Sequence, residues 1–228
     1  MSKQKQSHIE RTANEPRDES LHTLTISDIT VVSPTIRLFR LEIPPHHTIK
    51  FLPGQWVDLY PPPHTGIKKP GGFTITSSPS LAVARRPPAA THRHSPDDEA
   101  QPEPTTAASP SPAYLELAIQ SSPTNPPAAY LFQPAAELLR NEVRVRIGGS
   151  FVFPPPAAAL APPPLRKAVF VAGGMGINPL MSMLSFIGEQ RDRWAGLEVR
   201  VLYSFVEALV SPAGLGMQQK RVLFEKWW

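Results

Sequence analysis

A glycine-rich turn that follows an apolar run is the sharpest chemical signal in this sequence. The run Lys167–Ala172 reads KAVFVA, as expected of a strand buried on both faces, and Gly173, Gly174 and Gly176 follow it directly. Because glycine has no Cβ, main-chain N–H groups can approach a phosphate or a polar ring closely, and a following helix N-terminus favours an anion. Pro179 stands where the third glycine of a GxGxxG fingerprint would be, so a purely structural turn stays open as an interpretation.

A second group of polar side chains lies in the first half of the chain. The segment 71–79 reads GGFTITSSP, which predicts a strand that carries the hydroxyl groups of Thr74, Thr76 and Ser77 beside Phe73. The ring of Phe73 offers a face on which a planar ligand can stack. In isolation, a solvated Thr/Ser strand explains the same pattern.

The composition excludes several classes of function. With no cysteine among the 228 residues, this chain alone holds no disulfide, iron–sulfur cluster or thiolate zinc site, and the histidines lack ligand spacing. The net charge of +4 is spread thinly, which disfavours nucleic-acid binding, and no apolar run is long enough for a membrane span. Residues 1–20 match neither a transit peptide nor a secretory signal and are expected to be a disordered lead.

Short strands with turn signals fill residues 21–153 and indicate an antiparallel β-barrel. Residues 80–112 are rich in Pro, Ala, Ser and Thr and predict a low-complexity insert in a loop. A short helix is expected over Ala128–Arg140, broken near Pro134. The strands are expected at Leu21–Thr30, Ile36–Ile43, Trp56–Tyr60, Gly71–Ser78, Tyr114–Ser122 and Val143–Ile147.

A proline-rich spacer, residues 154–164, separates this part from residues 165–228. After the spacer, the strand Lys167–Ala172 leads through the glycine turn into a helix, and a second apolar strand is expected at Glu198–Tyr203. Asn178 is a favoured N-cap, and Pro179 suits the first helical position. This order is the beginning of a doubly wound α/β unit with a parallel sheet. The apolar face of its helix is expected to hold Leu180, Met181, Met183, Leu184 and Ile187.

In this order, four motifs resemble the ferredoxin–NADP reductase superfamily, and within it the group of oxidoreductase NAD-binding domain-containing proteins. The motifs are PGQW (53–56), GGFTITSSP (71–79), VAGGMGINPL (171–180) and the ending FEKWW (224–228). The resemblance implies a six-stranded Greek-key flavin barrel over 21–153. It also implies a nucleotide-binding unit over 165–228, which is too short for a complete doubly wound domain of this type.

The resemblance also implies cofactors and site residues. The cofactors are FAD, with FMN as the alternative, and NAD or NADP. Thr74 would hydrogen-bond flavin N5 as the catalytic residue, Phe73 would pack on the flavin, and Trp228 would either cover a flavin face or belong to the core. The other implied cofactor-binding residues are Thr76, Ser77, Gly173, Gly174, Gly176, Ile177, Asn178 and Pro179.

The chain departs from the superfamily pattern at three places. Gly71 stands where an arginine pairs with the flavin phosphate, although Lys68 or Lys69 could substitute from the adjacent loop. Residues 125–128 have lost the glycine of a second flavin-phosphate turn. The segment expected after the second parallel strand is missing, which indicates an internal deletion between Ser204 and Phe205.

The resulting hypothesis is an NAD(P)H-dependent flavin oxidoreductase that moves hydride between nicotinamide and flavin N5 and passes electrons to an unidentified acceptor. One alternative is a non-catalytic flavin- or nucleotide-binding remnant of the same fold. Another is an interaction scaffold whose proline-rich insert docks SH3 or WW domains. An intracellular location is expected, in mitochondria by family resemblance or in the cytoplasm.

Overall fold

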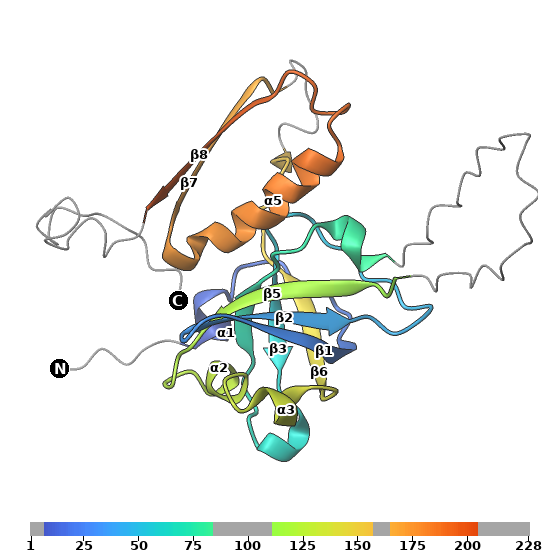
Figure 1. Cartoon of the computed structure of the whole chain (residues 1–228), viewed down its shortest axis with the longest axis vertical. Coiled ribbons are helices and arrows are strands. Elements are labelled where there is room, and N and C mark those ends of the chain that lie inside the picture. The colour runs from blue at the N-terminus through green and yellow to red at the C-terminus, as the bar shows by residue number, and fades with distance from the viewer. Residues whose placement is uncertain (1–6, 84–110, 157–164, 205–228) are drawn as a thin grey trace, which may run out of the picture.

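The computed structural model describes residues 7–83, 111–156 and 165–204 (Figure 1). Six antiparallel strands form one sheet in the order β4-β3-β6-β1-β2-β5. Its two edge strands meet at a bridge between Ile75 and Leu117, which closes the sheet into the predicted barrel. The strands are β1 (His22–Ser33), β2 (Ile36–Glu42), β3 (Trp56–Tyr60), β4 (Gly71–Thr74), β5 (Tyr114–Gln120) and β6 (Glu142–Gly148).

The barrel core follows from the alternation of the strands. In the β2–β5 pair, Phe39 faces Leu117 and Leu41 faces Leu115, and all four side chains are fully buried. The residues between them point outward, as expected for period-two strands. Full burial of each such side chain contributes about 1.5–3 kcal/mol to the free energy of unfolding.

Short helical turns fill the connections of the barrel. The predicted helix over 128–140 is two short helices, α2 (Pro126–Tyr130) and α3 (Ala135–Leu138), separated near Pro134 as expected. The 3₁₀ turns η1 (Pro63–Thr65) and η2 (Pro79–Ala82) follow β3 and β4. The strand expected up to Ser78 ends at Thr74 instead, because the next residues turn toward β5.

The expectation that residues 1–20 form a disordered lead is wrong for residues 7–20. This segment contains α1 (His8–Arg11) and lies against the barrel, where Arg17 forms a bridge with Gly148. Two of its basic side chains, His8 and Arg17, bind the buried carboxylate of Asp58. Composition alone does not reveal such a segment, because its order comes from charged partners that are distant in sequence.

The second unit begins with β7 (Lys167–Gly173), turns through η3 (Gly174–Gly176) into α5 (Ile177–Glu189), and ends with β8 (Glu198–Ser204). The two strands are parallel, as predicted. A small core joins the strand and the helix and contains Phe153, Ala172, Leu180 and Met183. Figure 1 shows α5 between this two-stranded sheet and the barrel.

The sheet of the second unit is not buried on both faces in the described part of the chain, contrary to the prediction for Lys167–Ala172. Val169, Val171 and Leu202 share the face opposite α5 and are 61%, 71% and 58% exposed. A parallel sheet normally has helices on both faces. Among the described residues, only one helix covers this sheet. The described part of the chain also contains no helix that is long and apolar enough to cross a membrane.

Candidate functional site at the junction of the two units

A row of polar side chains on α5 joins the glycine-turn unit to the barrel. The side-chain amide of Asn178 donates to the carbonyl oxygen of Ala118 on β5, at 2.9 Å. One turn later, the hydroxyl of Ser182 donates to the carbonyl oxygen of Ser77, at 2.6 Å. We call Asn178 and Ser182 the docking pair of α5.

Burial makes the docking pair selective for one arrangement of the two units. Asn178 is 6% exposed and Ser182 is fully buried. A buried polar group that loses its partner costs about 1–3 kcal/mol. Sliding α5 along the barrel would break both hydrogen bonds at once, so the pair fixes the position of the glycine turn relative to β5. Near the far end of the helix, the hydroxyl of Ser78 donates to the carboxylate of Glu189, at 2.5 Å.

The N-cap expected at Asn178 is wrong. The helix begins at Ile177 with Gly176 as its N-cap, and no side chain caps it. Pro179 is accordingly the third helical residue and not the first. The turn η3 runs straight into α5, which moves the start of the helix toward the N-terminus and leaves the amide of Asn178 free to reach the barrel. Met181, predicted on the apolar face, is 46% exposed.

The glycine turn lies at the carboxyl end of β7, beside the end of β8. Gly174 has a φ of +51°, which glycine adopts without strain. A side chain at Gly176 would meet no atom within 4 Å, so the space above it is open to a ligand. The hydroxyl of Tyr203 donates to the carbonyl oxygen of Gly174, at 3.3 Å. Gly173 and Ile177 flank this turn, and Ile177 packs against the small core.

The Thr and Ser side chains after β4 are mostly buried and form hydrogen bonds within the barrel. Thr76 and Ser77 are 8% and 4% exposed. The hydroxyl of Thr76 donates to the carbonyl oxygen of Glu116, at 3.1 Å, and the hydroxyl of Ser77 accepts from the N–H of Glu116, at 3.0 Å. These side chains close the barrel where the β4–β5 ladder is short. Thr74 differs: it is half-buried, and its hydroxyl has no hydrogen-bond partner among the described residues.

Phe73 faces the interior of the barrel. It is 9% exposed, belongs to the barrel core and pairs with Val57 on β3. Its ring lies over Gly71, where an added Cβ would be 2.6 Å from Phe73 Cε2 and 2.9 Å from Pro127 Cβ. Stacking of Phe73 on a flavin would therefore require the ring to leave this position. Trp228, the other aromatic residue implied to contact the flavin, lies outside the described residues.

On the outer face of β4, Gly72 makes room for the N-terminal segment. An added Cβ at Gly72 would collide with the imidazole ring of His8. That ring lies edge-on to Trp56, with 4.7 Å between the ring centroids. Both faces of the 71–72 glycine pair are thus filled by other parts of the chain.

Asp58 anchors the N-terminal segment and is the most strongly perturbed acid near β4. Its carboxylate is fully buried and accepts hydrogen bonds from His8, Arg17 and Arg146, at 2.7–3.1 Å. Burial raises the pKa of Asp58, but these hydrogen bonds and the charge of Arg17 outweigh it and lower the pKa to about 2. The carboxylate therefore stays charged and has a structural role.

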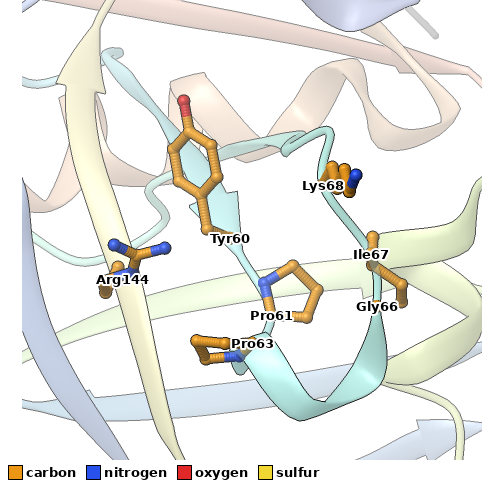
Figure 2. Close-up of a pocket in the computed structure, with 7 residues that line it drawn as sticks. All are labelled: Tyr60, Pro61, Pro63, Gly66, Ile67, Lys68 and Arg144. Atoms are coloured by element: carbon orange, nitrogen blue, oxygen red, sulfur yellow. The ribbon is translucent and has the colours of Figure 1, made fainter.

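A basic hollow of about 370 Å³ lies beyond the end of β3. Figure 2 shows Tyr60 and Arg144 on neighbouring strands, with Lys68 across from them on the following loop. The guanidinium carbon of Arg144 is 5.9 Å from the centroid of the Tyr60 ring. Neither cation has an ion-pair partner among the described residues. Lys68, which the sequence offered as a substitute for the phosphate-pairing arginine, thus lines this hollow together with Arg144.

Sequence reasoning missed the residues that hold the site together. Ser182 interrupts the apolar run of α5, and Asp58 is a lone charge in the apolar strand β3. Each is a polar residue inside an otherwise apolar run, which is the signal that could have singled it out. Their partners are distant in sequence and could not be read from it.

The solved structures that this fold matches define its class. The CS-b5R domains of human Ncb5or in an NAD+ form match with a TM-score of 0.55 at 19% identity, over 82% of this chain and 44% of that one. Ferredoxin-NADP+ reductase from Plasmodium falciparum matches with a TM-score of 0.52 at 17% identity, over 81% and 59% of the two chains. The fold is that of ferredoxin–NADP reductase-type proteins, an antiparallel six-stranded barrel followed by an α/β unit.

Sequence similarity then narrows this class. The chain is 31% identical over 211 residues to oxidoreductase NAD-binding domain-containing protein 1 of Homo sapiens, covering 91% of this chain and 55% of that protein. It is 35% identical over 188 residues to the Xenopus laevis protein of the same name, covering 82% and 48%. No family model matches the chain. The chain is related to this group, which confirms the resemblance of its motifs, and it spans about half the length of these relatives.

Proposed function

We propose that this chain is an NAD(P)H-dependent flavin oxidoreductase of the ferredoxin-reductase type, or the corresponding half of one. The observation that carries the proposal is the docking pair of α5. Through Asn178 and Ser182, it holds the glycine turn against the barrel next to the segment that follows Thr74. The relationship to oxidoreductase NAD-binding domain-containing proteins supports the same chemistry.

Each unit has one place suited to a cofactor ring. At the barrel, Thr74 presents a half-buried hydroxyl without a described partner, which would hydrogen-bond the edge of a flavin ring. At the second unit, the open space above Gly176 and the uncapped start of α5 would receive NADH or NADPH. A bound flavin would supply the chemistry by taking a hydride from the nicotinamide and passing electrons to an acceptor that is still unidentified.

The fit to FAD is incomplete. Thr74 suits the ring of a flavin. Gly71 provides no charged side chain for the diphosphate, and the two prolines that begin α2 provide no N–H group for it. Fewer of the implied residues therefore contact a cofactor than the resemblance implies. Thr74 and the glycine turn meet the ligands, Thr76 and Ser77 close the barrel, and Asn178 and Ser182 position one unit on the other.

A second candidate function is binding without turnover. The exposed outer face of the β7–β8 sheet favours it, because a nucleotide domain of this type normally has more strands and helices than the described residues provide. The scaffold hypothesis concerns the proline-rich insert, of which residues 84–110 lie outside the described residues, and it stays a prediction. The mitochondrial location implied by family resemblance also stays a prediction.

Anaerobic spectroscopy tests the proposal. The purified chain is mixed with excess flavin, freed of unbound flavin by gel filtration, and then titrated with NADH or NADPH. Retained flavin absorbance that bleaches on titration supports the oxidoreductase. Retained flavin that stays oxidised supports binding without turnover. A chain that retains no flavin and shows no binding at equilibrium refutes the flavin function.

A further inference from the structure

The 71–72 glycine pair and α2 form the part of the barrel where the family pattern implies contacts to a flavin diphosphate, and here that part is closed. At Gly71, an added Cβ would lie 2.6–2.9 Å from atoms of Phe73 and Pro127. Real Cβ atoms do not approach other atoms so closely. A long basic side chain at position 71 would therefore have to displace a core aromatic ring, and the structure has no room for it.

The main chain of α2 does not compensate for the missing side chain. Pro126 and Pro127 are its first two residues, and proline has no N–H group. Asn125, the N-cap, makes no side-chain hydrogen bond to the helix. The start of α2 therefore lacks two of the amide donors with which a helix N-terminus usually holds an anion.

The two lysines of the preceding loop serve other places. Lys68 lines the basic hollow with Tyr60 and Arg144. Lys69 lies near Glu10 of the N-terminal segment: hydrogen bonds from Ser7 lower the pKa of Glu10, and the charge of Lys69 adds to this effect. Lys68 thus lines a hollow whose lining includes neither Gly71 nor a residue of α2.

We propose that this chain recognises a flavin by its ring and not by its diphosphate, so that riboflavin, FMN and FAD bind with affinities within about threefold of one another. A charge-assisted contact to phosphate is worth roughly ten- to a hundredfold in affinity, and the described residues provide none at this place. The inference rests on the proposed function, because it requires that a flavin binds at all.

Equilibrium dialysis of the full chain against each of the three flavins tests the inference without any turnover. Dissociation constants within about threefold are expected. FAD affinity should also change little between low and high salt, because no exposed ion pair with phosphate is screened. FAD that binds more than about tenfold tighter than riboflavin overturns the inference but leaves the proposed function standing. Failure of all three flavins to bind overturns both.

Lysine variants show whether the loop supplies a hidden phosphate contact. Lys68→Ala and Lys69→Ala should leave the ratio of FAD to riboflavin affinity unchanged, as should the control Lys50→Ala, at an exposed lysine elsewhere on the barrel. A loss of FAD affinity of about tenfold, with riboflavin affinity unchanged, in either loop variant would assign that lysine to the phosphate and overturn the inference.

Discussion

Replacing Ser182 with alanine tests how α5 is held on the barrel. The hydroxyl is fully buried and donates to the carbonyl oxygen of Ser77, at 2.6 Å. The substitution removes one hydrogen bond and leaves that carbonyl without this donor, at a cost of about 1–2 kcal/mol. In a chain of this size, each kcal/mol lowers Tm by roughly 2–4 °C. Ser182→Ala should therefore unfold a few degrees below the parent chain.

The matched control is Ser185→Ala on the exposed side of the same helix. It removes the same group at nearly the same helical position, and its effect should stay within about 0.5 kcal/mol. Differential scanning calorimetry measures both variants. Hydrogen exchange then shows whether the amides of α5 lose protection before those of β5, as expected when docking and not the barrel is weakened. Equal Tm values for Ser182→Ala and Ser185→Ala would refute the role of the docking pair.

Three further predictions concern the barrel. Asp58→Asn removes a buried charge from three basic partners and should cost about 3–5 kcal/mol in unfolding free energy, measured by urea denaturation. The pKa of Asp58 is lowered from 3.8 to about 2 in the folded chain, so its contribution to stability is complete above pH 3.8 and is lost as the pH falls toward 2. The stability of the Asn variant should not decrease in this way over the same pH range. Gly72→Ala should displace His8 and lower the free energy of unfolding by about 1–3 kcal/mol. The control Gly188→Ala, in open space on α5, should raise the free energy of unfolding by about 0.5–1 kcal/mol. An equal effect of the two substitutions would contradict the packing of His8 over Gly72. Burial, and then the neighbouring imidazole, lower the pKa of His22, so stability should fall as the pH drops below 6.5, and His22→Phe should flatten that part of the pH profile measured by Tm.

The sequence by itself predicted the class of fold and the order of its elements. Period-two apolar residues in short segments predicted the barrel strands, because such a strand must bury one face. The run at 167–172 with its glycine turn predicted the parallel unit. These signals are local, and local geometry alone determines where each hydrophobic side chain points.

Only the tertiary structure decided what the polar residues do. Asn178 has the local features of an N-cap, yet its amide is buried against β5, and Thr76 and Ser77 have the features of a ligand site, yet their hydroxyls hold Glu116. The order of residues 7–20 depends on Asp58 in the same way. Directional hydrogen bonds and ion pairs are determined by partners brought together across the fold, and the free energy of burying a polar group depends on those partners and not on its neighbours in sequence.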